Sequence, residues 1–300
     1  MDSIFRQNPA LGQGCFGKVY KGKYQEQTAA IKVVPDHKLD ENQLDRECRA
    51  FGQLNHKNIV KLLGEPEKRG DKWYFPLEYI SGSTLEDLMF KNGALTDKAN
   101  VIIIHGMCDG LNYIHMKNIV HQDLKPDNIM IEARTNRAVL IDFGLTKFID
   151  YTASGREITS GRNLGNKAYY APEVQQGLIR SRRSDVWAMG KIMAELILGR
   201  RLSTDECVPH NVKKLLSGKG FAEPICRMLH GNKKQRVHMS DVIQSIHGVT
   251  SIVSSTNVFS VACMVGGAFL FAGAAALGAA PVALVGAVVS VAGAATVHKP

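Results

Sequence analysis

Apolar residues gather into short runs in the middle of the chain, at residues 119–120, 129–131 and 139–141. Runs of this length, bounded by turn-forming residues, predict short buried strands. The polar stretch at residues 121–128 separates the first two runs, so it is expected to form an exposed connection. The third run leads directly into Asp142, which places that carboxylate at the end of another strand.

The predicted strand ends hold polar side chains suited to binding an ion. If the strands lie side by side, Asp123, Asn128 and Asp142 share one cleft. Oxygen ligands such as those of Asn128 and Asp142 suit magnesium, which proteins usually hold with one or two side chains together with substrate phosphates. Ordinary turns are the alternative, because Asp, Asn, Pro and Gly favour turns in any protein.

A helix is predicted where Leu44, Cys48, Phe51 and Leu54 recur at spacings of three to four residues. This spacing marks the inner face of an amphipathic helix. Glu47 lies on the same face, and a carboxylate turned toward a core is costly unless it is paired. We therefore expect a cationic partner for Glu47, the alternative being that its side chain reaches past the apolar stripe to water.

A strand is predicted around Lys32. Alternation along it puts Ala30 and Lys32 on one face and Ile31 and Val33 on the other. A small residue and a cation therefore share one face of this strand. The alternative is that Lys32 is a solvated lysine at a sheet edge.

The C-terminal tail differs in composition from the rest of the chain. No charged residue occurs from Gly248 to Val297, and Gly, Ala and Val dominate from about Val258 onward. Residues 258–280 are long enough to cross a bilayer as a helix, for which about 20 residues are needed. Pro281 then interrupts, so residues 258–297 are expected to form either a Gly/Ala-rich helical hairpin or one transmembrane helix followed by an interfacial segment. The alternative is an apolar tail that folds onto the rest of the protein or binds a partner.

Five motifs follow one another along the chain. They are the glycine-rich stretch at residues 11–19, Ala29-Ala30-Ile31-Lys32, His121-Gln122-Asp123-Leu124-Lys125-Pro126-Asp127-Asn128, Asp142-Phe143-Gly144 and Ala171-Pro172-Glu173. A lone glycine-rich loop is weak evidence, but the ordered series resembles the protein kinase family.

The resemblance implies an α+β fold with two lobes. The N-terminal lobe would be small and mainly β, with one helix, and the C-terminal lobe larger and α-helical. The kinase domain would cover residues 5–248, with the N-lobe at about 5–77, a hinge at 78–81 and the C-lobe at 82–248.

The resemblance also implies roles for individual residues. Asp123 would orient the substrate hydroxyl and accept its proton, and Lys125 would offset charge on the transferred group. Lys32 would hold the α- and β-phosphates and would itself be fixed by Glu47. The expected ligands of Mg²⁺, with Mn²⁺ as an alternative ion, are Asn128 and Asp142, and the residues expected to contact ATP are Leu11, Gly12, Gln13, Gly14, Cys15, Phe16, Gly17, Lys18, Val19, Ala30, Lys32, Leu77, Glu78, Tyr79, Ile80 and Met130.

Two further matches imply structural roles. Glu173 is expected to pair with Arg236, and Asp185 is expected to hold the backbone of the loop that contains Asp123. Glu173, Arg236 and Asp185 are not expected to take part in the chemistry of the site.

The catalytic motif is similar to that of serine/threonine kinases, because Lys125 is typical of that branch. Two residues depart from the family pattern. Gln122 stands where most members have Arg, and a neutral side chain cannot make the charge-assisted bidentate contact with a phosphorylated activation segment. Asn166 stands where Thr is common, which leaves the positioning of the substrate in question.

The charge pattern bears on partners and location. The formal net charge is +9, which favours an anionic membrane surface or acidic substrates. Lys233, Lys234 and Arg236 precede the apolar tail, and a positive-inside bias would leave the kinase domain in the cytoplasm. We therefore expect a membrane-associated protein that acts on protein substrates with Ser or Thr hydroxyls. Self-association stays open, and nucleic acid is not expected, since no recognition motif accompanies the basic residues.

Cysteine usage gives no sign of a metal site. The six cysteines are scattered, with no CxxC pair, which suits a reducing compartment.

Three functional classes follow from the sequence. The favoured one is an active serine/threonine kinase tethered to a membrane. The second is a pseudokinase-like scaffold, suggested by Gln122 and Asn166 and opposed by the intact set of Lys32, Asp123 and the two metal ligands. In the third, the tail is a membrane-active effector and the kinase domain regulates it.

Overall fold

The computed structural model of the protein describes residues 4–13, 17–39, 41–91, 95–151, 157–158 and 166–247. The chain divides into two units, Met1–Val253 and Ser254–Pro300, and the second unit lies outside the described residues. The predicted membrane segment at residues 258–297 therefore lies outside them as well. Within the described ranges, no helix is both long enough and apolar enough to span a bilayer.

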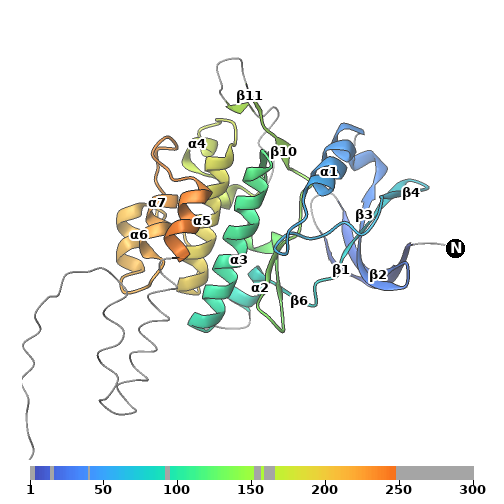
Figure 1. Ribbon diagram of the computed structural model, residues 1–300, viewed down its shortest axis with the longest axis horizontal. Helices are drawn as coiled ribbons and strands as arrows, with labels where there is room; N and C mark the ends of the chain where they lie inside the picture. The colour runs from blue at the N-terminus through green and yellow to red at the C-terminus, as the bar shows by residue number, and fades with distance from the viewer. Residues whose placement is uncertain are drawn as a thin grey trace, which may run out of the picture. The chain divides into compact units, whose positions relative to one another are not determined.

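The N-terminal part is an antiparallel sheet with one helix. Its strand order is β1-β2-β3-β5-β4, and Figure 1 shows this sheet beside α1. The bounds are β1 Ile4–Gln13, β2 Lys18–Tyr24, β3 Gln27–Pro35, α1 Glu41–Gln53, β4 Glu67–Arg69 and β5 Lys72–Glu78, with a short 3₁₀ turn, η1 Asp36–Lys38, before α1.

The two faces of β3 contact different clusters of side chains, as the alternation predicts. Ile31 and Val33 belong to a small cluster with Tyr24 and Ala29. Ala30 packs against the main core, which begins here and continues through the helical part. Lys32, on the face of Ala30, is only 7% exposed, so the interpretation of Lys32 as a solvated edge lysine is wrong.

The C-terminal part is mainly helical, with short strands on either side of the loop that contains Asp123. Helix α3 begins after Thr96, whose hydroxyl accepts a hydrogen bond from the Ala99 N–H at 3.2 Å, and its residues Ile103, Met107 and Ile114 are fully buried. Figure 1 shows α3 and α5 next to each other. The bounds are β6 Gly82–Thr84, α2 Leu85–Phe90, α3 Asp97–Met116, β7 Ile119–Val120, η2 Pro126–Asn128, β8 Ile129–Glu132, β9 Ala138–Leu140, β10 Lys147–Phe148, β11 Asp150–Tyr151, β12 Glu157–Ile158, η3 Lys167–Tyr169, α4 Pro172–Gln175, α5 Arg182–Leu198, α6 Pro209–Leu215 and α7 Ala222–Met228, and residues 239–247 are also helical.

The three apolar runs of the central region are strands, as predicted. They correspond to β7, β8 and β9. Strand β8 pairs with β6 on one side and with β9 on the other, and β7 pairs with β10. The backbone N–H of Ile141 donates to the Asn128 carbonyl at 3.1 Å. This contact brings the segment that leads into Asp142 against the loop between β7 and β8.

Candidate active site

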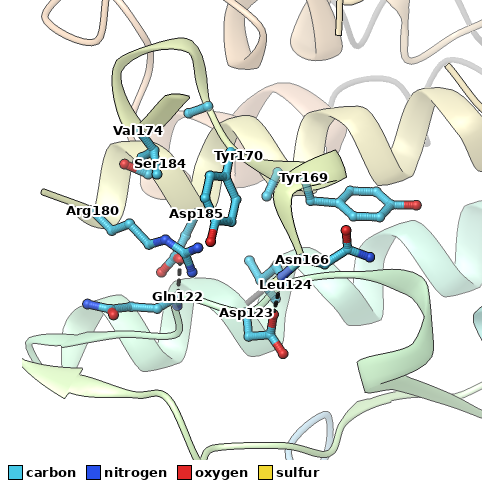
Figure 2. Close-up of a pocket in the computed structure, with 12 residues that line it drawn as sticks. Gln122, Asp123, Leu124, Asn166, Tyr169, Tyr170, Val174, Arg180, Ser184 and Asp185 are labelled. Carbon is cyan, nitrogen blue, oxygen red and sulfur yellow. Dashed lines mark hydrogen bonds between the residues drawn. The ribbon is translucent and has the colours of Figure 1, made fainter. Parts of the chain in front are cut away.

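The loop between β7 and β8 presents Asp123. Its Oδ2 accepts a hydrogen bond from the Asn128 side-chain amide at 2.9 Å. The Lys125 ammonium nitrogen lies 3.5 Å from the same oxygen. The other oxygen, Oδ1, accepts from the backbone N–H of Asn166 at 3.2 Å, as Figure 2 shows. Asp123 is therefore fixed by its own loop and by the segment that precedes η3.

Asp185 of α5 holds the backbone of this loop. Its two carboxylate oxygens accept hydrogen bonds from the backbone N–H groups of His121 at 2.8 Å and Gln122 at 3.0 Å, and Nε2 of His115 lies 3.1 Å from Oδ2. Gln122 has a φ of 70°, which residues other than glycine rarely adopt. The predicted role of Asp185 in holding this loop is confirmed, and it accounts for how the unusual conformation of Gln122 is retained (Figure 2).

Lys32, on β3 of the N-terminal sheet, contacts two acidic residues of the candidate site, Glu47 and Asp142. Its ammonium nitrogen lies 2.5 Å from Glu47 Oε1 and 3.2 Å from Asp142 Oδ1. Glu47 is 3% exposed, so the cationic partner that its position predicts is present. Burial favours the neutral form of Lys32, but the charges of Asp142 and Glu47 outweigh it and raise the pKa of the ammonium.

Asp142 is held as a carboxylate. Burial opposes its ionisation, but the neighbouring charge of Lys32 and a hydrogen bond from the Gly144 N–H keep its pKa below the ordinary value. That N–H lies 3.1 Å from Asp142 Oδ1. An ionised Asp142 is the form that can bind a divalent cation.

Phe143, the residue after Asp142, packs into the core and so fixes the position of Asp142. It is 1% exposed. Its ring meets Phe51 of α1 edge to face, with 5.4 Å between centroids, and lies 5.3 Å from the ring of His121. These contacts connect α1 and the loop of Asp123 through one side chain, which places Glu47, Asp142 and Asp123 in one packed unit.

The residues expected to contact ATP come from five strands and the connection after β5. Leu77 is 4% exposed and Leu11 is 55% exposed. Gly17 packs against β3, where a Cβ would meet the Val33 carbonyl oxygen at 2.1 Å. Residues 14–16 lie outside the described residues. The structure places the remaining candidates on β1 (Leu11, Gly12, Gln13), before and on β2 (Gly17, Lys18, Val19), on β3 (Ala30, Lys32), on and after β5 (Leu77, Glu78, Tyr79, Ile80) and on β8 (Met130).

The oxygen donors present fit Mg²⁺. Asn128 uses its amide nitrogen to bind both the backbone carbonyl of Asp123, at 2.8 Å, and its carboxylate. Its amide oxygen is therefore the atom suited to a metal, and the carboxylate of Asp142 is the second donor. One amide and one carboxylate oxygen are the donor set that Mg²⁺ takes when phosphates complete its shell.

Several contacts of this site could not be derived from the motifs. Asn166 reaches Asp123 through its backbone rather than its side chain. Lys191 donates to the Ala168 carbonyl at 2.7 Å, and Arg137 donates to Glu78 at 2.8 Å. These contacts join positions far apart in the sequence, so no local pattern marks them.

Comparison with known proteins gives a consistent result. Residues 5–246 match the family model described as protein kinase domain. The chain is similar to "Receptor-like kinase LIP2" of Arabidopsis thaliana, with 36% identity over 233 residues, which cover 74% of this chain and 41% of that protein. It is also similar to "Receptor-like kinase LIP1" of the same organism, with 34% identity over 74% of this chain and 35% of that protein. A bacterial relative is "Serine/threonine-protein kinase pkn3" of Myxococcus xanthus, with 29% identity over 65% of this chain and 38% of that protein. The matched region thus spans less than half the length of these relatives.

Proposed function

The chain belongs to the protein kinase family, and on that premise we propose that it transfers the γ-phosphoryl group of ATP to serine and threonine hydroxyls of protein substrates. The observation that carries the proposal is the contact of Lys32 with both Glu47 and Asp142, in a site where Asp123 is fixed on two sides. A group that positions phosphates, a metal ligand and a base are then all in place, and positioning with electrostatic stabilisation accounts for most of the catalysis of phosphoryl transfer.

Each residue has a defined task in this proposal. Lys32, fixed by Glu47, binds the α- and β-phosphates of the nucleotide. Asp123 accepts a hydrogen bond from the substrate hydroxyl and takes its proton. Lys125, whose ammonium lies 3.5 Å from the Asp123 carboxylate, places a positive charge where the transferred group would carry negative charge.

The metal site follows from the donors already described. Asn128 and Asp142 would hold Mg²⁺, which neutralises phosphate charge when it is bound with ATP. The low pKa of Asp142 keeps this ligand ionised at neutral pH. Asn128 also orients Asp123 through its amide nitrogen, so one side chain would connect the metal site to the base.

Activation is proposed not to depend on a phosphate bound at position 122. Gln122 is 8% exposed, its backbone is held by Asp185, and its side chain is neutral. It therefore cannot form the bidentate ion pair that an arginine makes with a phosphorylated segment. If phosphatase treatment abolished activity and a single phosphosite among residues 145–170 restored it, this part of the proposal would be wrong.

Tethering to a membrane through residues 258–297 is a separate part of the proposal. It rests on the length and apolar composition of that stretch and on the basic residues before it. The test is fractionation of cells that produce the full chain or a chain without residues 258–297. Full-length protein in the soluble fraction would count against the tether. Loss of a membrane activity with kinase turnover intact would instead support an effector role for the tail.

The test of the enzymatic proposal is Mg²⁺-dependent transfer of phosphate from ATP to a generic protein substrate by the full chain. Asp142→Asn should lower kcat by about 100-fold or more, because it removes one charged, preorganised group of the site. Asp205→Asn is the matched control, since Asp205 is exposed. If wild type and Asp142→Asn were both inactive while nucleotide still bound, the scaffold interpretation would replace the enzymatic one.

A further inference from the structure

Lys191 is a buried lysine in the middle of α5. It is 2% exposed, and its neighbours Met189, Ile192 and Met193 are fully buried apolar residues. A buried ammonium is costly unless polar groups compensate it. An apolar side chain of similar length would satisfy the packing of α5, so the contacts of the ammonium group call for a separate explanation.

The ammonium of Lys191 contacts the segment that precedes α4. It donates a hydrogen bond to the Ala168 carbonyl at 2.7 Å and lies 5.1 Å from the centre of the Tyr169 ring. Glu195, one turn further along α5, is 3.9 Å away and accepts a hydrogen bond from the Tyr169 hydroxyl at 2.8 Å. Two side chains of α5 thus hold two consecutive residues of η3.

The shorter of the two ammonium contacts is the one to the backbone. The Glu195 carboxylate has other donors, because its Oε1 accepts a hydrogen bond from the Leu202 N–H at 2.9 Å and its Oε2 accepts from Tyr169. The Ala168 carbonyl is therefore the acceptor that Lys191 binds most closely.

Ala168 is fixed at both of its backbone polar groups. Its carbonyl is held by Lys191, and its N–H donates to the Asn166 side-chain oxygen at 3.0 Å. The backbone N–H of Asn166 in turn donates to Asp123 at 3.2 Å. Asp123, Asn166 and Tyr169 line the same pocket (Figure 2). A continuous chain of hydrogen bonds through Ala168 and Asn166 therefore joins Lys191 to the proposed base.

We propose that Lys191 is a positioning residue for protein phosphorylation. By holding the Ala168 carbonyl on α5, its ammonium keeps the Asn166 N–H within donating distance of Asp123 and fixes the segment beside which a substrate hydroxyl would lie. This inference rests on the proposed kinase function. It separates Lys191 from nucleotide binding, since the contacts of its ammonium in the described part of the chain are with Ala168, Tyr169 and Glu195.

The test compares Lys191→Met with Lys191→Gln in the full chain. Methionine removes the donor and nearly keeps the volume, whereas glutamine keeps an N–H donor on a side chain that is one atom shorter. Lys191→Met should lower kcat for a protein substrate by about tenfold, the loss that corresponds to one hydrogen bond in the reactive geometry. Lys191→Gln should recover part of that loss. The KM for ATP and the binding of Mg-ADP should be unchanged in both variants.

Lys213→Met, at an exposed position of α6, should behave like wild type. If Lys191→Met fails to fold, Lys191→Leu carries the test, because it also removes the donor and leaves the contact between Tyr169 and Glu195 in place.

The results of these measurements distinguish failure of the proposed role of Lys191 from failure of the proposed kinase function. A folded Lys191→Met or Lys191→Leu variant with a normal kcat for protein, or with nucleotide binding lost in parallel, would overturn the positioning role. A wild-type chain that binds Mg-ADP but transfers no phosphate would overturn the kinase function instead.

Discussion

Arg236 and Glu173 form a buried, bidentate ion pair, with Nη1 of Arg236 2.8 Å from Oε1 of Glu173 and Nη2 2.9 Å from Oε2. The sequence predicts this pairing, and the structure confirms it. Additional hydrogen bonds surround the pair, because the guanidinium also donates to the carbonyls of Arg183 and His230, and Ser184 donates to Glu173. The pair joins α4 to the start of α5 and to the loop before the last helix.

Glu173→Ala should strongly destabilise the protein. It leaves the Arg236 guanidinium buried without its carboxylate, and the loss of one partner of a buried pair costs about 3–5 kcal/mol. The free energy of unfolding from urea titrations monitored by tryptophan fluorescence measures this loss. The matched control is Glu206→Ala, which breaks the exposed pair with Arg200 at 2.9 Å, and its effect should be much smaller. Similar losses in the two variants would contradict this account.

Arg137 connects three parts of the chain around the proposed nucleotide site. Its guanidinium donates to the Lys57 carbonyl at 2.7 Å, to Glu78 at 2.8 Å and to Glu132 at 3.3 Å. Glu78 ends β5 and is itself one of the residues expected to contact ATP, so Arg137 should help to fix the position of this part of the site.

Arg137→Met should raise the KM for ATP and leave kcat almost unchanged. The three side chains are each more than a quarter exposed, so the expected effect is modest, roughly two- to fivefold. Initial rates at varied ATP concentration measure it. Arg134→Met, on the same turn and exposed, is the matched control. A fall in kcat without a change in KM would show that Arg137 acts elsewhere.

Gly17→Ala should disturb the glycine-rich stretch. A Cβ at this position would lie 2.1 Å from the Val33 carbonyl oxygen, so the backbone of β3 or of the stretch itself has to move. Because Lys32 neighbours Val33, we expect weaker binding of Mg-ATP, measured as a smaller thermal shift on adding nucleotide.

Gly52→Ala provides the control for that substitution. Gly52 lies in the last turn of α1, and a Cβ there would meet nothing within 4 Å in the described residues beyond the adjoining backbone of its own helix. Alanine there should be neutral or stabilise the helix by up to about 1 kcal/mol. Unchanged nucleotide binding in Gly17→Ala would show that the close approach to β3 is unimportant for the site.

The parts of the fold and of the candidate site that could be predicted from the sequence are those marked by periodicity or by a local motif. The spacing around Glu47 places it on the buried face of α1, and the alternation around Lys32 places the ammonium on the face that Glu47 approaches. Each of these two patterns lies within a short stretch of consecutive residues, so it can be recognised in one sequence without knowledge of the fold. The contacts of Arg137 and Lys191 instead depend on how distant segments pack, and a lysine within an apolar helix does not reveal that its acceptor is a carbonyl 23 residues earlier.

Burial of His121 should make the stability of the protein depend on pH. Its imidazole is fully buried, and burial lowers its pKa despite the nearby carboxylates of Asp185, Asp123 and Asp142. In the unfolded chain the ordinary pKa of histidine, about 6.5, applies. The unfolded state therefore takes up a proton first as the pH falls, and this contribution to stability, complete above about pH 6.5, is lost toward the lower pKa of the folded state.

The free energy of unfolding, measured by urea titration at intervals from pH 7.5 to 5.5, should fall with pH. His121→Phe should make the decrease shallower, by at most about 1.4 kcal/mol per pH unit, because it removes one group that binds a proton only in the unfolded chain. His210→Phe, at an exposed position, should keep the wild-type slope. Equal slopes in wild type and His121→Phe would mean that the imidazole of His121 is protonated in the folded protein, balanced by the Asp185 carboxylate that already holds its backbone N–H.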